Sequence, residues 1–343
     1  MENPCLTFVS PTILSGDKSN SFVIAHEIAH SWTGNLVTNA NMEHFWLNEG
    51  FDVFLHRKII GRLQGELSRH FEHELRWSQL EEDVNQNLGP DNPFTALVTN
   101  LTGVHPDEAF SSVPYEKGSA FLWYLEETLG GPEVFEPFLR SYIDHFAYKS
   151  IDTDDFKSYL LDYFNENSAV ASIDWETWLY SPGLPEKPNF NASLAVQSRD
   201  LAAQWQLWNQ ESPLTPSFQA EYLELSPFQQ REFLATLIKS DPALPAATVA
   251  KLDALYGLSN STNYYILVPF TRLGLAAKWE PSVEKALEIV SSQGTYEFTR
   301  PLYKDLYSWE DKRQQAVDTF LLNKEKYMEV VVNAVMQDLN LKK

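Results

Sequence analysis

Apolar residues recur at three- and four-residue spacing through most of the chain, which is the pattern of amphipathic helices. In the first half this periodicity predicts a series of helices, whose expected bounds are 23–30, 47–63, 67–85, 115–129, 132–147 and 154–166. Segment 67–85 is rich in Glu and Arg, so we expect its helix to present a solvated polar face. Residues 1–10 instead have the composition of a β-strand.

A segment with three prolines and a glycine in eleven residues, 181–191, divides the chain. After it the periodicity predicts amphipathic helices without metal-ligand or nucleophile motifs, at 195–209, 227–240, 246–256, 262–278, 283–292 and 311–338. Paired helices of this kind stack into an α-solenoid of the armadillo or HEAT type. We therefore expect a mainly α chain with a first domain at 1–183, a proline-rich linker at 184–192 and a helical solenoid at 193–343.

Charge and cysteine content narrow the class of protein. The 343 residues include 26 Lys and Arg against 47 Asp and Glu, a net charge of −21. Such a surface repels phosphate backbones and anionic lipid, so we predict no nucleic acid and no membrane as partner. The single cysteine, Cys5, excludes a disulfide framework and is expected to be buried. The chain has no apolar run of about 20 residues and no signal-peptide layout, which predicts a cytoplasmic protein.

One short motif carries chemistry, the pattern H-E-x-x-H within residues 24–30. On a helix His26 and His30 lie on one face, so both imidazoles can reach one zinc ion while Glu27 faces the same space. Glu49, in an N-E-G sequence after the intervening residues 31–48, supplies a third ligand from the next helix. Two histidines and one glutamate leave a fourth position for water, as in a catalytic zinc site. We predict one Zn²⁺ per chain.

The surroundings of this motif give weaker signals. Ile24 and Trp32 are expected to help form an apolar wall that excludes water from the back of the metal. His70 and His73 lie on the polar helix, where we predict that they are solvated. His56 has no partner at ligand spacing and is predicted to take no part in the metal site.

Five stretches extend the motif into a wider pattern: HEIAHSWTGNLVT at 26–38, HFWLNEG at 44–50, SSVPYEKG at 111–118, WLYSPGLP at 178–185 and FTRP at 298–301. This pattern resembles the gluzincin zinc aminopeptidases, and within them the leukotriene A4 hydrolase and aminopeptidase B branch. The resemblance implies a thermolysin-like zincin catalytic domain at 1–183. It also implies a zinc aminopeptidase that releases N-terminal residues from short peptides with a free N-terminus.

The resemblance further implies roles for individual residues. Glu2 matches the family's G-x-M-E-N glutamate, which binds the free α-amine of the substrate. Zinc acidifies a water and polarises the scissile carbonyl, Glu27 acts as the general base, and Tyr115 stabilises the developing oxyanion. Asp107 aligns with the acidic residue that places a water for epoxide hydrolysis; taken alone, it is expected to be a loop or cap residue.

Three features depart from the family pattern. The chain begins inside G-x-M-E-N, so we expect a C-terminal portion whose missing N-terminal domain packs against residues 1–183. Thr295 and Glu297 stand where two positive residues hold a substrate carboxylate, and Phe110 replaces a second tyrosine. These substitutions disfavour leukotriene A4-type epoxide hydrolysis, the first alternative function. Two further hypotheses stay open: an inactive fragment in which only the helical module survives, and a zinc endopeptidase that needs no free N-terminus.

Overall fold

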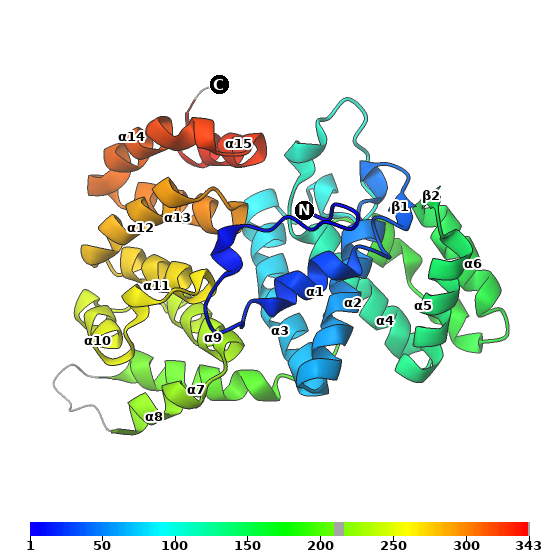
Figure 1. Ribbon diagram of the computed structural model, residues 1–343, viewed down its shortest axis with the longest axis horizontal. Helices are drawn as coiled ribbons and strands as arrows, with labels where there is room; N and C mark the ends of the chain where they lie inside the picture. Colours follow the sequence, from blue (N-terminus) through cyan, green and yellow to red (C-terminus); the bar gives the residue numbers. More distant parts are fainter. Residues whose placement is uncertain (209–215, 342–343) are drawn as a thin grey trace. The chain divides into compact units, whose positions relative to one another are not determined.

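The computed structural model describes residues 1–208 and 216–341, and most of these residues are helical (Figure 1). The prediction of a mainly α chain is therefore confirmed. The chain folds into two compact units. The first unit contains Met1–Val9 and Ser21–Ala192, and the second contains Ser10–Asn20 and Ser193–Lys343.

The first unit is a bundle of helices with one two-stranded parallel sheet. Its elements are α1 Ser21–Ala29, β1 Val37–Asn39, α2 Trp46–Gln64, α3 Glu66–Glu82, α4 Val113–Leu129, α5 Pro132–Phe146, β2 Lys149–Ile151 and α6 Thr153–Tyr163. In the sheet, Val37 lies opposite Lys149. All six predicted helices are present with similar bounds, and the helix predicted at 67–85 continues beyond α3 as a π-helical turn at Asp83–Leu88.

The predicted strand at 1–10 is wrong. The Leu6 N–H donates to the Asn3 carbonyl and the Phe8 N–H donates to the Met1 carbonyl, which closes a turn. A strand needs a neighbour to satisfy its backbone groups, and among the described residues only β1 and β2 pair as strands.

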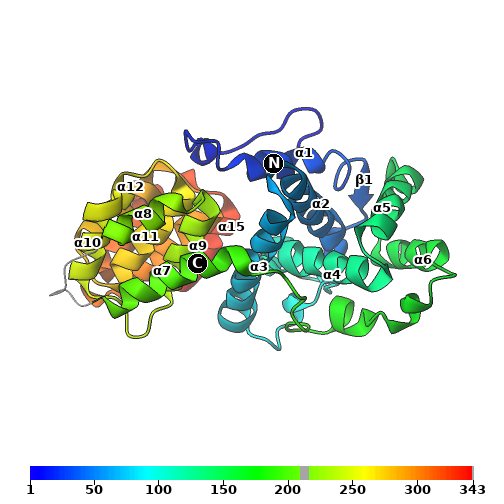
Figure 2. The same ribbon diagram turned by 90° about the horizontal axis from the view of Figure 1, so that it is seen from below.

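Helices α2 and α4 cross closely, side by side in Figures 1 and 2. The contact is made at two glycines: a Cβ on Gly50 would lie 2.8 Å from the Cα of Gly118. Such a distance excludes any side chain at this position without movement of the backbone. Because Glu49 precedes Gly50 and Tyr115 lies one turn before Gly118, the crossing brings these two polar side chains to the same end of the helix pair.

Helix α3 buries charge, so its predicted solvated face is wrong for one side of the helix. Arg69, Glu72 and His73 are each at most 3% exposed. The guanidinium of Arg69 lies 2.7 Å from Glu126 on α4, and Glu72 lies 3.3 Å from the Nε2 atom of His56 on α2. A charged side chain can be buried where such partners compensate for the loss of water. Here the partners are contributed by helices α2 and α4.

The second unit is a succession of helices that follow one another from α7 to α15 in Figure 1. Its helices are α7 Ser193–Leu207, α8 Pro216–Glu224, α9 Pro227–Ile238, α10 Ala246–Tyr256, α11 Tyr264–Ala276, α12 Pro281–Ser292, α13 Tyr296–Ser308, α14 Arg313–Asn323 and α15 Glu329–Asp338. Helices α8 and α13 were not predicted. The helix predicted at 311–338 is divided into α14 and α15, and the last residue of the helix predicted at 195–209 lies outside the described residues.

The boundaries of the two units differ from the predicted domains. The linker at 184–192 belongs to the first unit, and segment 10–20 belongs to the second. Within the second unit, the Thr262 hydroxyl donates to the Ser15 carbonyl at 2.7 Å, and the Asn263 amide donates to the Ser19 hydroxyl at 2.9 Å. Sequence periodicity does not report such contacts because they join residues about 250 positions apart.

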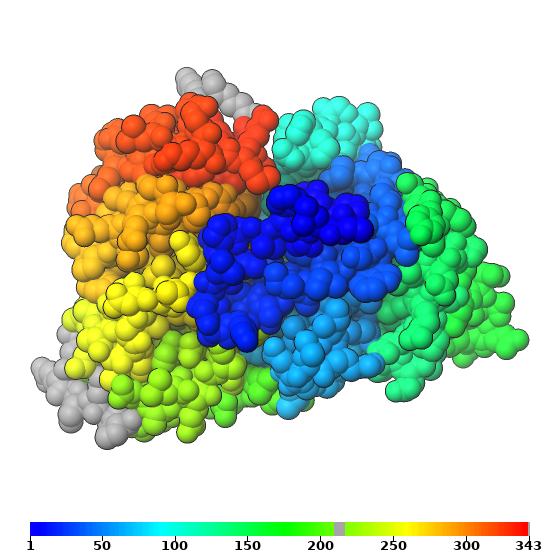
Figure 3. All heavy atoms as spheres, viewed as in Figure 1, coloured from blue at the N-terminus to red at the C-terminus, as the bar shows by residue number. Residues whose placement is uncertain are grey.

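Residues near the start of the chain form part of the molecular surface, dark blue in Figure 3. Several apolar side chains among them are exposed. Ile24, Ile28 and Trp32 are 39%, 49% and 45% exposed, so the predicted apolar wall behind the metal is wrong. Cys5 is also exposed, against the prediction. An exposed apolar stripe of this kind is typical of an interaction surface, and the predicted packing of an N-terminal domain against residues 1–183 stays a prediction.

None of the helices in the described part of the chain combines the length and the apolar character that crossing a membrane requires. The cytoplasmic location stays a prediction.

Lys117 on α4 fixes two distant segments and gives a test of the fold. Its ammonium is fully buried and donates to the carbonyls of Thr95, Ser181 and Gly183 at 2.9–3.0 Å. We predict that Lys117→Met lowers the free energy of unfolding by about 2–4 kcal/mol, because three buried carbonyls lose their donor. Urea denaturation measures this change. Replacement of the exposed Lys251 by Met is the control, and an equal effect of both substitutions would contradict the prediction.

Candidate active site

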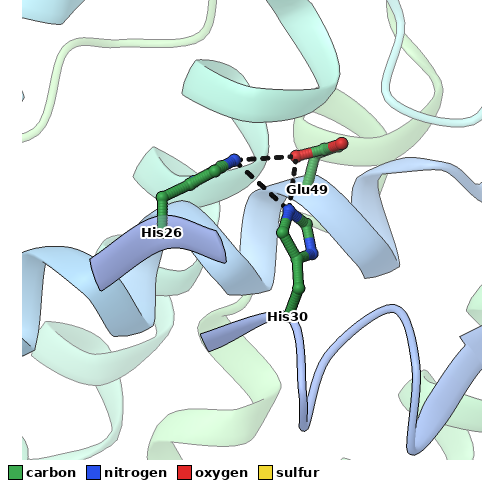
Figure 4. A group of neighbouring side chains, drawn as sticks. All are labelled: His26, His30 and Glu49. Atoms are coloured by element: carbon green, nitrogen blue, oxygen red, sulfur yellow. Dashed lines mark hydrogen bonds and ion pairs between the residues drawn. The ribbon is translucent and has the colours of Figure 1, made fainter. Parts of the chain in front are cut away.

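Helices α1 and α2 bring the three predicted metal ligands together (Figure 4). His26 lies on α1, His30 lies directly after its last residue, and Glu49 lies in the first turn of α2. The Nε2 atoms of the two histidines are 3.2 Å apart, and each lies 3.5 Å from Oε2 of Glu49. The four-residue spacing of the two histidines therefore directs both imidazoles to the same side, toward the carboxylate of Glu49 on α2.

This cluster fits a zinc ion. Donors bound about 2.1 Å from a tetrahedral ion lie about 3.4 Å from one another, close to the observed distances of 3.2 and 3.5 Å. Oε2 of Glu49 is buried without a hydrogen-bond partner, as expected for an atom that faces a cation. The side chains of His30 and Glu49 are 2% and 6% exposed, whereas that of His26 is 19% exposed. The cluster is thus accessible from the side of His26.

The other ring nitrogens have separate partners. Nδ1 of His30 lies 3.0 Å from the carbonyl of Thr33, an acceptor that fixes the proton on this nitrogen. Nδ1 of His26 lies 3.2 Å from Nδ1 of His56 and 2.5 Å from Oδ2 of Asp52. Metal-binding histidines characteristically use their second nitrogen in this way.

The clustered charges change the proton affinities of these groups. Burial lowers the pKa of His26, although Glu49 opposes this effect. Burial also disfavours the charged form of His30, but the carboxylates of Glu49 and Asp52 outweigh it and raise the pKa of His30 to about 9. Burial raises the pKa of Asp52 to about 9, with His30 opposing it.

Glu2 and Glu27 lie on the same side of the cluster. A carboxylate oxygen of each lies within 4.8 Å of the other and of a ring nitrogen of His30. Oε2 of Glu27 is buried without a hydrogen-bond partner and lies 3.1 Å from the ammonium group of Met1. The two carboxylates thus form an anionic patch beside the proposed metal-binding atoms.

Tyr115, in the first turn of α4, completes the site. Its ring stacks with that of His26 at a centroid distance of 6.5 Å and meets the rings of Phe45 and Phe110 edge-on at 6.1 and 6.4 Å. Burial, and then the negative charge of Glu49, raise the pKa of Tyr115 well above its usual value. The hydroxyl therefore keeps its proton and is available as a hydrogen-bond donor.

The remaining predicted residues lie outside this cluster. Asp107 is 42% exposed and lies in the first turn of the short helix Pro106–Ala109, whose N-cap residue is His105. In the second unit, Glu297 is paired with Arg231 and accepts from the Tyr265 hydroxyl.

Sequence reasoning missed three polar residues next to the cluster, Asp52, His56 and Glu72. Their side chains are 0%, 6% and 4% exposed. A signal for two of them was present, because Glu49, Asp52 and His56 are spaced by three and four residues and so share one face of α2. Nothing in the local sequence of α3 indicates that Glu72 meets that face.

Comparison with known proteins agrees with this geometry. A family model described as "Peptidase family M1 domain" matches residues 1–178, and one described as "Leukotriene A4 hydrolase, C-terminal" matches residues 225–339. The chain therefore belongs to peptidase family M1. The predicted fold class, a zincin catalytic domain followed by a helical domain, is confirmed, as is the resemblance to the leukotriene A4 hydrolase branch.

Individual relatives carry two kinds of name. Leukotriene A-4 hydrolase of Xenopus laevis is 46% identical over 343 residues, covering 99% of this chain and 56% of that protein. Leucine aminopeptidase 2 of Aspergillus terreus is 41% identical over 347 residues, covering 100% of this chain and 55% of that protein. A solved structure of yeast LTA4 hydrolase in complex with bestatin superposes with a TM-score of 0.91 at 38% identity, covering 99% of this chain and 57% of that one. The chain thus spans little more than half the length of these relatives.

Proposed function

We propose that this chain carries the active site of a zinc-dependent aminopeptidase that acts on short peptides with a free N-terminus. The observation that supports it best is the zinc-spaced triad of His26, His30 and Glu49, with the carboxylate of Glu27 and the ring of Tyr115 beside it. The family match and the relatives named leucine aminopeptidase support the same reaction class.

The residues of the site divide the work of peptide hydrolysis. When bound, zinc supplies Lewis-acid chemistry, which polarises a carbonyl and makes a water more acidic. Glu27 accepts a proton from the attacking water and later delivers it to the leaving amine. The Tyr115 hydroxyl, kept protonated by its surroundings, donates a hydrogen bond to the oxygen that becomes negative.

Selection for a free amine is assigned to the anionic patch. A carboxylate that faces an ammonium group forms a charge-assisted hydrogen bond, which is strong where water is excluded. Glu2 lies within reach of Glu27 and His30, so an ammonium group held by Glu2 lies next to the metal-binding atoms. This placement limits cleavage to the first peptide bond.

The test is hydrolysis of a panel of aminoacyl-anilides by the purified chain 1–343, with zinc content measured on the same sample. Turnover that a chelator abolishes and zinc restores supports the proposal. N-acetylated versions of the same substrates are the control and should be inert. Equal cleavage of acetylated and free substrates would indicate an endopeptidase, and folded protein without zinc or turnover would refute the proposal for this chain.

Replacement of Tyr115 by Phe tests the oxyanion assignment. We expect kcat to fall about 10²–10³-fold, because one donor to the developing negative charge is removed. Zinc content should not change, since the hydroxyl is not one of the three zinc-spaced donors. Tyr124→Phe, which removes a hydroxyl from the same helix, is the matched control. A Tyr115→Phe variant with parental kcat would contradict the role.

Epoxide hydrolysis of a lipid is not proposed, although some relatives are named leukotriene A4 hydrolase. Phe110 lies against Tyr115 but has no hydroxyl to contribute. Glu297 brings a negative charge, compensated by Arg231, to a position where the resemblance implies a positive one.

A further inference from the structure

The two nitrogens of the His26 ring face different groups of residues. Nε2 faces His30 and Glu49, the other members of the zinc-spaced triad. Nδ1 faces His56 and Asp52, which with His26 form a second group whose potential ligand atoms lie within 4.8 Å of one another. One imidazole is therefore shared between two polar clusters, and the distances within each cluster indicate their different roles.

The second cluster does not have the spacing of a metal site. Its shortest contact, 2.5 Å between Nδ1 of His26 and Oδ2 of Asp52, is about 0.9 Å shorter than the edge of a tetrahedral zinc site. The contact between Nδ1 of His26 and Nδ1 of His56, at 3.2 Å, has the geometry of a hydrogen bond. The second cluster is therefore a set of partners for His26 and not a second metal site.

The protons of this cluster can be assigned from Glu72. A carboxylate accepts hydrogen bonds, so the contact of 3.3 Å between Glu72 and Nε2 of His56 places a proton on that nitrogen. In a neutral imidazole the other nitrogen, Nδ1 of His56, is then an acceptor. It accepts from Nδ1–H of His26, and this leaves the lone pair of His26 Nε2 directed at His30 and Glu49.

We infer that His56, oriented by Glu72, is a positioning residue that holds the metal ligand His26 in its metal-binding tautomer. The inference rests on the proposed zinc site and adds an outer partner that the sequence analysis did not assign. His30 has an equivalent arrangement, because its Nδ1 faces the Thr33 carbonyl. The Nδ1 atom of each histidine thus faces an acceptor, which is a backbone carbonyl for His30 and the His56 side chain for His26.

Asp52 contributes differently. It lies close to Nδ1 of His26, yet neither of its buried oxygens has a hydrogen-bond partner. The acceptor with hydrogen-bond geometry toward Nδ1 of His26 is therefore His56. Loss of His56 therefore removes the tautomer control while leaving Asp52 in place.

The test is the zinc affinity of the metal-free chain 1–343, measured by competition with a chromophoric chelator. In His56→Leu we expect the dissociation constant for zinc to rise about 10–100-fold, the usual cost of losing an outer partner of a metal-binding histidine. His56→Gln should stay within about threefold of the parent, because its amide can accept from His26 and donate to Glu72. The visible spectrum of the Co²⁺-substituted protein should change in the Leu variant and be preserved in the Gln variant.

Matched variants separate this role from packing. His73→Leu removes another buried imidazole, one that contacts Arg57 and Phe190, and should lower stability without weakening zinc binding. Glu72→Met removes the acceptor of the Nε2 proton of His56 and should weaken zinc binding at least threefold, which keeps the test available if His56→Leu does not fold. Parental zinc affinity in a folded His56→Leu or in a folded Glu72→Met would overturn the inference alone. A parent chain that binds no zinc would overturn the proposed function as well.

Discussion

Replacement of Glu27 by Gln is expected to lower kcat for aminoacyl-anilide hydrolysis about 10²–10⁴-fold while zinc stays bound. The amide cannot accept the proton of the attacking water, and general acid–base catalysis contributes a factor of this size. Zinc binding should persist because Glu27 is not a member of the zinc-spaced triad. Steady-state kinetics combined with metal analysis of the same sample measure both quantities.

A control variant separates catalysis from a general effect of charge. Glu133→Gln on α5 changes the net charge equally at an exposed position and should leave kcat unchanged. Thermal unfolding should show that Glu27→Gln is folded. Parental turnover in Glu27→Gln would mean that another group is the base, and loss of zinc would mean that Glu27 belongs to the metal site.

Replacement of Glu49 by Ala should remove zinc and with it all turnover. Glu49 supplies the only carboxylate of the zinc-spaced triad, and its buried Oε2 faces both histidines at 3.5 Å. Loss of a direct ligand is expected to weaken zinc binding more than the roughly 10–100-fold cost of losing an outer partner. Zinc content after dialysis against a weak chelator measures the effect, and excess zinc should restore part of the activity.

The control for Glu49 is another buried carboxylate on the same helix pair. Glu116 lies on α4 and pairs with Arg57 at 2.7 Å, outside the zinc-spaced triad. Glu116→Gln should therefore retain zinc even if it lowers stability. Unchanged zinc content in a folded Glu49→Ala variant would contradict the assignment of Glu49 as a ligand.

Helix prediction succeeded where one helix face is apolar and failed where tertiary contacts decide. Helix α10 has its predicted bounds because its buried positions, among them Val249 and Leu252, recur at helical spacing. Residues 1–10 have strand composition, yet a strand forms only with a neighbour to pair with. Helix α13 was not predicted, although its buried residues Phe298 and Leu302 recur at helical spacing.

The sequence alone identified the three residues of the proposed zinc site. A spacing of four residues on one helix fixes the relation of His26 to His30, and this relation is local. The N-E-G sequence identified Glu49, although its distance from the histidines depends on how α2 packs against α1. The family resemblance added Glu2 and Tyr115 and assigned Glu27 its role as general base.

Only the tertiary structure shows which residues lie behind the proposed metal ligands. Glu72 meets His56 only because α3 packs against α2, and His56 meets His26 only because α2 packs against α1. From sequence, a polar helix is predicted to be solvated, since burial of an unpaired charge is strongly disfavoured. Its charged side chains can be buried when other helices supply partners for them, and packing rather than the local sequence determines which residues these partners are.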